Sequence, residues 1–96
     1  MALEKYVKTV RGKNKGNIFL FALSTCAHCM NAKRLLKDLG PAYFYVDVDL
    51  LPKKAQEEVV KEMSRWNPAG SFPTIVFDGK KCVVGFEEAK IRQMLK

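Results

Sequence analysis

The segment NIFLFALSTCAHCMNAKRLLKDLGP, residues 17–41, joins an apolar stretch to a helical pattern through two closely spaced cysteines. The apolar stretch at 17–23 has the continuous hydrophobicity of a strand that is buried on both faces. Beyond the cysteines, apolar residues recur at the spacing of one helix face: Ala32, Leu35, Leu36 and Leu39. Gly40-Pro41 then supplies a left-handed cap and a helix breaker. The segment therefore predicts a buried strand followed by a helix that begins at the cysteines.

Cys26 and Cys29 are the candidate reactive residues. Cys26 stands where the helix is expected to begin, and the unpaired N–H groups and dipole of a helix start favour a thiolate. Cys29 lies one turn further on, close enough to form a disulfide with Cys26 yet shielded by the helix. His28 is either a spacer or, as we favour, a cation that stabilises the thiolate. The pattern predicts a redox pair in which Cys26 attacks and Cys29 resolves.

Two other interpretations of these cysteines are a metal site and inert burial. A structural zinc site needs four ligands, and the soft donors available in the chain are few: Cys26, His28, Cys29 and Cys82. Because His28 and Cys29 are adjacent and no second Cys-X-X-Cys pair exists, we expect no metal. Inert burial fits poorly with the polar segment STCAH. Cys82 is expected to be a small buried hydrophobe, with a regulatory or resolving thiol as the alternative.

Three further strand regions are expected along the chain. Residues 4–10 predict a short strand, followed by a turn cluster and paired in a hairpin with the strand at 17–23. Residues 42–50 predict a strand with Asp47 and Asp49 at the surface or at the strand end, and with these side chains inside: Phe44, Val46 and Val48. Residues 74–84 predict a hairpin with a tight primed turn at Asp78-Gly79. Parallel and antiparallel strands are therefore expected in one sheet.

Two further helices are expected to pack on this sheet. One begins near Pro52 and stops at Asn67-Pro68, with an apolar stripe: Ala55, Val59, Val60, Met63 and Trp66. Trp66 is expected in the core, and a partly exposed ring that binds a partner near Pro73 is the alternative. The last helix begins at about Glu87, and Ile91 and Leu95 face inward.

The composition limits the classes of function. A chain of 96 residues predicts one domain, spanning 1–96, and 48% hydrophobic with 28% charged residues is an ordinary globular balance. The longest apolar run is far too short for a membrane span, and no basic-then-apolar signal segment opens the chain, so a cytoplasmic location is expected. The net charge of +7 comes from bases scattered among acids, so no nucleic-acid partner is expected.

The strand, the Cys26-X-X-Cys29 pair at a helix start, the proline of GSFPT (70–74) and a glycine before the last helix resemble the glutaredoxin family. The resemblance covers residues 17–96 and implies a thioredoxin/glutaredoxin α/β fold, a mixed four-stranded sheet flanked by helices. Residues 1–16 would form an N-terminal extension, a strand and turn added to that sheet. The Phe72-Pro73 bond would be cis, and the backbone of Phe72 would pair with the incoming substrate.

The same resemblance implies a groove beside Cys26, formed by Thr25, Phe72, Pro73, Gly85, Phe86, Glu87 and Glu88. Gly85, Glu87 and Glu88 match the family's glutathione-binding stretch, whereas Val84 does not, and Leu23 replaces a common basic residue. CAHCMNAKRLL (26–36) also resembles the glutaredoxin-like hydrogen donors of ribonucleotide reductase, which take electrons from thioredoxin reductase.

The resemblance therefore implies a monomeric dithiol–disulfide oxidoreductase that reduces disulfides of protein substrates, or glutathione mixed disulfides, without a bound cofactor. Glutathione or thioredoxin reductase would supply the electrons. One alternative is a glutathione-dependent carrier of an iron–sulfur cluster, in which a dimer holds the cluster through Cys26 and glutathione. Another is a non-catalytic binding module that uses the same groove.

Overall fold

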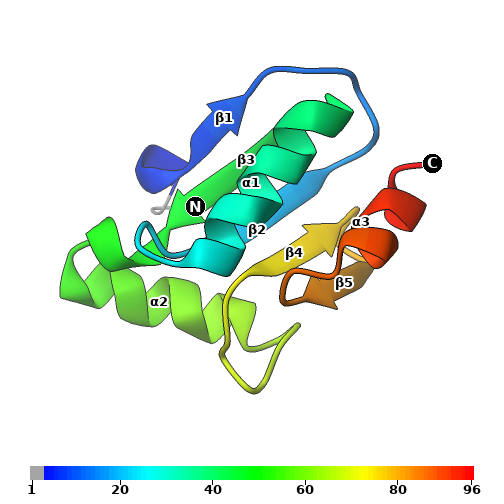
Figure 1. Cartoon of the computed structure of the whole chain (residues 1–96). Coiled ribbons are helices and arrows are strands. Elements are labelled where there is room, and N and C mark those ends of the chain that lie inside the picture. Colours follow the sequence, from blue (N-terminus) through cyan, green and yellow to red (C-terminus); the bar gives the residue numbers. More distant parts are fainter. Residues whose placement is uncertain (1–3) are drawn as a thin grey trace.

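A five-stranded mixed sheet with helices on both faces forms the fold of the computed structural model, which describes residues 4–96 (Figure 1). The strands are β1 (Lys8–Val10), β2 (Ile18–Ala22), β3 (Tyr43–Asp47), β4 (Thr74–Phe77) and β5 (Lys81–Val84). The α-helices are α1 (Ala27–Leu39), α2 (Lys53–Met63) and α3 (Glu88–Met94), and η1 (Glu4–Tyr6) and η2 (Val48–Leu50) are 3₁₀ turns. This is the thioredoxin/glutaredoxin fold that the resemblance implied.

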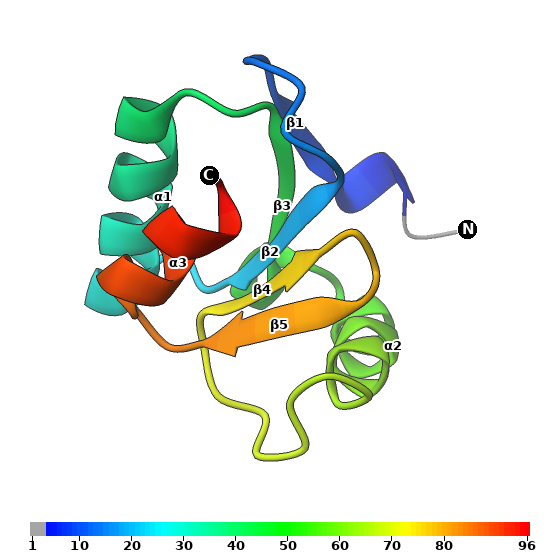
Figure 2. The same cartoon turned by 90° about the vertical axis from the view of Figure 1, so that its right-hand side faces the viewer.

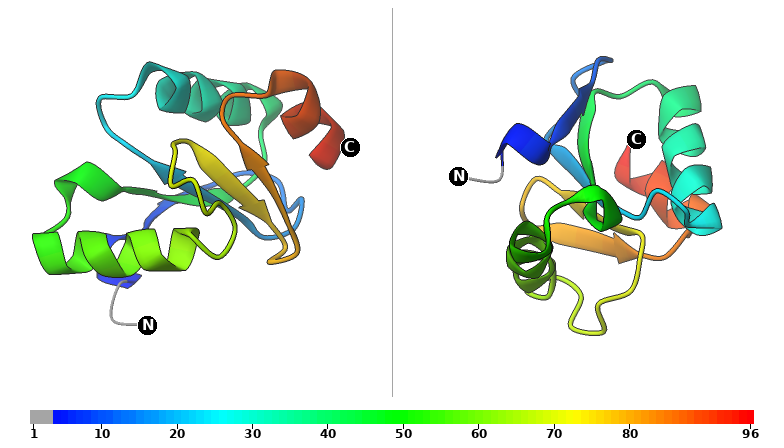
Figure 3. Two further views of the ribbon diagram at one scale, coloured as in Figure 1. Left: turned by 90° about the horizontal axis from the view of Figure 1, so that it is seen from below. Right: turned by 90° about the vertical axis from the view of Figure 1, so that its left-hand side faces the viewer.

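The strand order is β1-β3-β2-β4-β5, and only β2 and β3 run parallel. Helices α1 and α3 cover one face of the sheet and α2 covers the other (Figure 2 and Figure 3). β2 is the central strand, and its side chains alternate between the two covered faces. Its uninterrupted hydrophobicity follows from this position, because neither face of β2 is exposed to water.

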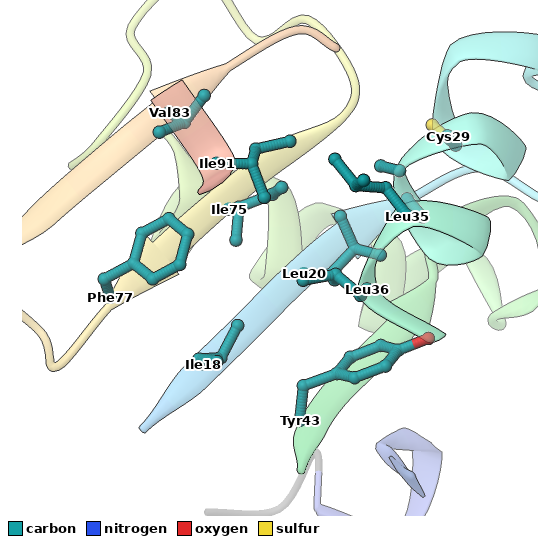
Figure 4. Packing of buried hydrophobic residues seen from close by; sticks show 12 residues of the cluster. Ile18, Leu20, Cys29, Leu35, Leu36, Tyr43, Ile75, Phe77, Val83 and Ile91 are labelled. Carbon is teal, nitrogen blue, oxygen red and sulfur yellow. The ribbon is translucent and has the colours of Figure 1, made fainter. Parts of the chain in front are cut away.

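Two hydrophobic cores hold the layers together. The α1–α3 core, part of which Figure 4 shows, comprises Ile18, Leu20, Ala22, Cys29, Ala32, Leu35, Leu36, Tyr43, Ile75, Phe77, Val83 and Ile91. The α2 core comprises Phe21, Val46, Val48, Leu51, Ala55, Val59, Met63 and Val76. Trp66 and Cys82 pack against the α2 core, but both are only half-buried and so less enclosed than expected. Ile91 is buried and Leu95 packs on the α1–α3 core, so the inward face of the last helix is also as expected.

The prediction for residues 4–10 was wrong in two respects. Residues Glu4–Tyr6 form η1 rather than a strand, and β1 pairs antiparallel with β3 rather than with β2. Both sides of β2 are occupied by β3 and β4, so β2 has no free side, and β1 pairs with the outer side of β3 instead. Of the expected extension at 1–16, residues 1–3 lie outside the described residues.

Three smaller predictions also need correction. The strand expected at 42–50 ends at Asp47, and the chain then turns through η2. Phe44 is 39% exposed because it belongs to neither core, whereas its neighbour Tyr43 is buried under α1. Val60 lies on the outer side of α2 and is 38% exposed, so it is not part of the buried stripe.

The structure confirms the primed turn predicted at Asp78-Gly79 and the helix cap predicted at Gly40. Asp78 and Gly79 both have a positive φ, 56° and 61°, as a primed turn requires. Gly40 ends α1 with a φ of 85° and donates its N–H to Leu36. Among residues 4–96, no helix is long and apolar enough to cross a membrane.

Replacing Gly12 by Ala should lower the free energy of unfolding by roughly 1–3 kcal/mol, the usual effect of overpacking. A Cβ at Gly12 would lie 2.5 Å from Gly40 O and from Pro41 C, where the chain before β2 crosses the end of α1. Lys13 fixes that crossing by donating to Gly40 O at 2.8 Å and accepting from the Ala42 N–H at 2.8 Å. Urea unfolding measures the change.

The control for this experiment is Lys15→Ala, an exposed residue of the same segment, which should change the unfolding free energy by less than about 0.5 kcal/mol. Equal stability of the two variants would show that the crossing at Gly12 tolerates a side chain.

Candidate active site

The loop after β2 places Cys26 at the N-cap of α1. Its backbone is extended, and its Sγ accepts the N–H of Cys29 at 3.2 Å. This N–H is one of the donors that the first turn of a helix leaves unpaired, and a sulfur that carries negative charge accepts it best. Cys26 is half-buried, so part of this residue remains accessible to a partner molecule. The position is suited to a nucleophilic thiolate.

Cys29 differs from Cys26 although it lies only one turn away. It is fully buried in the α1–α3 core, beneath the first turn of α1 (Figure 4). Burial, followed by the contact with Cys26, raises the pKa of the Cys29 thiol to about 12. The N–H of Leu23 points at its Sγ from 3.4 Å and favours the anion only partly. At neutral pH Cys29 is therefore a protonated, shielded thiol.

Hydrogen bonds to Asp49, which was expected as a surface or strand-end residue, hold the loop that carries Cys26. The Ser24 N–H donates to Asp49 Oδ1 at 2.7 Å, and the Ser24 hydroxyl donates to Oδ2. These two hydrogen bonds lower the pKa of Asp49. Asp49 lies in η2, after β3, so the parallel neighbour of β2 holds the loop in place. No signal in the sequence joins two residues so far apart.

The Phe72-Pro73 peptide bond is cis, which confirms that prediction. Strand register brings it to the cysteine loop, because Phe21 of β2 lies opposite Thr74 of β4, next to Pro73. The Gly85 N–H donates to Pro73 O at 2.8 Å and thereby brings the end of β5 to the same place. Residues distant in the sequence thus meet at one end of the sheet.

Asn67 holds the loop before Pro73, and sequence reasoning missed this residue. It is 4% exposed, and its Nδ2 donates to Ser71 O at 3.0 Å and to Thr74 Oγ1 at 3.0 Å. Its Oδ1 accepts the Ala69 N–H at 3.2 Å. A buried amide with every group satisfied specifies one loop conformation. The pattern Asn-Pro had indicated only the end of a helix.

Of the residues expected in the groove, some pack on the core and others are exposed. Phe72 and Phe86 pack, like Cys26, against the core that contains Cys29. Thr25 is exposed next to Cys26, and Glu87 is exposed before α3. Glu88 is exposed too, but its carboxylate pairs with Arg92 Nε at 2.8 Å on its own helix. His28 is exposed, and within residues 4–96 it forms no hydrogen bond or ion pair.

The candidate zinc ligands of the sequence analysis do not lie together in the structure. Cys29 lies in the α1–α3 core and Cys82 packs against the α2 core, so the sheet separates these two sulfurs. Among the described residues, no three His, Cys, Asp or Glu side chains are grouped so as to hold a metal ion. The free sulfurs near each other are those of Cys26 and Cys29.

Comparison with known proteins adds the family to this geometry. The glutaredoxin family model matches residues 18–83, which contain the cysteine pair and the cis-proline loop. The chain belongs to the glutaredoxin family. Its members generally act as thiol–disulfide oxidoreductases, and the free, N-capping Cys26 beside buried Cys29 agrees with that chemistry. No curated protein sequence matches the chain.

Solved structures of archaeal proteins are similar to this glutaredoxin over most of its length. Methanoredoxin of Methanosarcina acetivorans is 44% identical, with a TM-score of 0.85 and 88% of each chain covered. A glutaredoxin of Methanosarcina mazei Go1 is 43% identical, with a TM-score of 0.86, covering 94% of this chain and 87% of its own. A glutaredoxin of Archaeoglobus fulgidus is 26% identical, with a TM-score of 0.78, covering 82% of this chain and 85% of its own.

Iodoacetamide should label Cys26 before the other cysteines at mildly acidic pH. Cys26 is accessible and receives a helix N–H, whereas Cys29 is buried and its raised pKa keeps it protonated until strongly alkaline pH. Mass spectrometry of the digested protein after timed quenching identifies the labelled residue. A Cys26→Ser variant is the control and should react much more slowly. Faster labelling of Cys29 or Cys82 would contradict the assignment.

Proposed function

We propose that this glutaredoxin reduces protein disulfides through a mixed disulfide on Cys26. The observation that carries the proposal is the contrast between two neighbouring thiols, one half-buried at a helix N-cap and one fully buried a turn below. A dithiol reductant needs this asymmetry, because one sulfur must meet the substrate and the other must wait until the first has reacted. The family membership supports the same chemistry.

In the first step the Cys26 thiolate attacks one sulfur of the substrate disulfide. A Cys26–substrate disulfide forms, the substrate disulfide breaks, and the second substrate sulfur leaves as a thiolate that takes up a proton. The Cys29 N–H hydrogen bond stabilises Cys26 as an anion before the attack. Preorganised donors of this kind act strongly at a site that is partly shielded from water.

In the second step Cys29 loses its proton and attacks the Cys26 sulfur. The Cys26–Cys29 disulfide forms, the bond to the substrate breaks, and the substrate leaves as its second thiol. Helix α1 holds the two sulfurs one turn apart, with the Cys26 Sγ in contact with the backbone of Cys29. The attack is therefore intramolecular, which raises its rate by avoiding the entropic cost of an encounter.

The substrate would lie along the cis-proline loop, between Thr25 and the start of α3. There Phe72 can offer backbone hydrogen bonds to an extended segment, as an added strand does. Phe86 and Gly85 would form the opposite wall, with Glu87 and Glu88 at its end. Disulfide-containing proteins are the proposed substrates, and the protein is proposed to act as a monomer in the cytoplasm without a bound cofactor.

We propose a reductase, rather than glutathione, as the better electron source. Half-buried Leu23 offers no charge to a glutathione carboxylate, and exposed Val84 replaces a glycine of the binding stretch. Glu88, a further residue of that stretch, is engaged by Arg92. This favours a likeness to the glutaredoxin-like donors of ribonucleotide reductase over one to glutathione-dependent glutaredoxins.

The test compares turnover of a protein disulfide with NADPH and thioredoxin reductase against NADPH, glutathione and glutathione reductase. We expect turnover with thioredoxin reductase to be at least several times faster. Cys26→Ser should abolish turnover in both assays. Cys29→Ser should accumulate a mixed disulfide on Cys26 that is detected by its mass.

Activity that survives Cys26→Ser would overturn the proposed mechanism. Fast reduction by glutathione with none by thioredoxin reductase would leave the mechanism standing and reverse the choice of electron source.

His28→Ala should make the pair less oxidising at mildly acidic pH. A cation beside Cys26 stabilises the reduced form, because only that form carries the thiolate charge. His28 is exposed in the first turn of α1, so we expect a modest shift, on the order of 30 mV or ~1.4 kcal/mol for two electrons. Redox equilibrium with a glutathione buffer, at about pH 5.5 and about pH 8, measures it. An unchanged or more oxidising variant at the lower pH would make His28 a spacer.

A further inference from the structure

A partly buried ion pair lies under the active-site helix. Lys33 Nζ is 2.8 Å from Asp47 Oδ1, and the two side chains are 26% and 17% exposed. The same Nζ lies over the ring of Tyr45, 4.4 Å from its centroid. Asp47 had been expected at the surface or at the end of its strand; it does end β3, but its side chain is partly covered because Lys33 of α1 lies against it. The Lys33 ammonium is thus fixed from two sides.

Both members of this pair belong to segments that border Cys29. Lys33 lies one helical turn after Cys29, on the same side of α1. Asp47 is in register with Ala22 of β2, and the next residue, Leu23, directs its N–H at the Cys29 sulfur. Lys33 thereby links α1 to the strand end that borders the buried thiol.

The resolving step creates a specific electrostatic problem at this place. Cys29 must carry negative charge while it attacks, although its surroundings are apolar and a buried anion is strongly disfavoured. Lys33 is the nearby side-chain charge that opposes the effect of burial on the pKa of Cys29. A half-buried ammonium is unfavourable unless it is paired. Here the Asp47 carboxylate and the Tyr45 ring stabilise the Lys33 ammonium in that position.

We propose that Lys33 is a positioning residue for the resolving step, where its charge stabilises the Cys29 thiolate as Cys29 attacks the mixed disulfide. The inference rests on the proposed oxidoreductase function and adds a residue to it. In this step Cys29 gives up its proton, the Cys26–Cys29 bond forms, the Cys26–substrate bond breaks, and the leaving substrate thiolate gains a proton. Lys33 itself stays protonated throughout.

The test separates the two steps with a neutral aromatic disulfide, 4,4′-dithiodipyridine, mixed in excess with the reduced protein. A Cys82→Ser background leaves only the pair to react. Attack by Cys26 releases one pyridinethione in a phase whose rate rises with reagent concentration. Resolution by Cys29 releases the second in a phase independent of concentration. A neutral reagent avoids any direct attraction to Lys33.

Lys33→Met should slow the second phase about tenfold, the effect of about one pKa unit on a thiol that must ionise, and change the first phase less than about twofold. Lys33→Gln, which keeps a hydrogen-bond donor without the charge, should slow the second phase similarly. Lys33→Arg should restore it to within about threefold of the parent. Lys37→Met, an exposed position one turn further along α1, is the matched control and should change neither phase.

An unchanged second phase in both Lys33→Met and Lys33→Gln would overturn the proposal, as would equal slowing of both phases, which indicates a general disturbance of α1. Thermal unfolding shows whether each variant is folded. If Lys33→Met does not fold, the rate of the second phase in Lys33→Gln tests the proposal. A parent protein with no second phase at all would overturn the proposed function together with this role. A normal second phase that is insensitive to Lys33 would overturn this role alone.

Discussion

Burial of β2 on all sides is the constraint on which the rest of the structure depends. β3 and β4 flank this strand, and α1 with α3 on one face and α2 on the other bury its side chains, except for Phe19, which is half-buried. Leu20 and Ala22 are completely buried, and each large apolar side chain removed from water contributes roughly 1.5–3 kcal/mol. Because β2 leads directly into α1, the depth of this strand also fixes where Cys26 and Cys29 lie.

The difference between the two cysteines follows from a short-range effect of that geometry. When a helix starts at the end of a buried strand, its first N–H groups point towards the preceding loop, and one side of its first turn packs on the sheet. Cys26 occupies the outward position and receives an N–H, whereas Cys29 faces the core and stays protonated. A spacing of one turn therefore gives two sulfurs with different chemistry.

Polar side chains far from the cysteines in sequence then fix the loops around them. Asp49 holds Ser24 before Cys26, and Asn67 holds the loop before Pro73. Both anchors use hydrogen bonds to backbone groups, so they determine loop conformation rather than chemistry. Lys33 and Asp47 form a partly buried ion pair beside the helix turn that carries Cys29, and the Lys33 charge is proposed to act on that thiol. The site thus combines two reactive thiols, loop anchors and a nearby ion pair.

The sequence by itself determined whatever depends on neighbouring residues. The strand, Cys-X-X-Cys and helix of residues 17–41, the cap at Gly40 and the primed turn at Asp78-Gly79 follow from local patterns, and the structure agrees with them. The redox role of Cys26 and Cys29 rested on such a pattern together with the family resemblance. Local signals suffice there because backbone geometry at caps and turns depends on a few adjacent residues.

Tertiary structure alone decided the contacts that join distant segments. β1 went to the free side of β3, Cys82 came to lie across the sheet from Cys29, and Asp47 was covered by α1 and paired with Lys33. A strand's pattern shows which residues alternate, but not which neighbour remains unpaired or which helix covers a given end of the strand. These outcomes depend on how whole elements share the surface of the sheet, and that competition is settled only when all of them pack together.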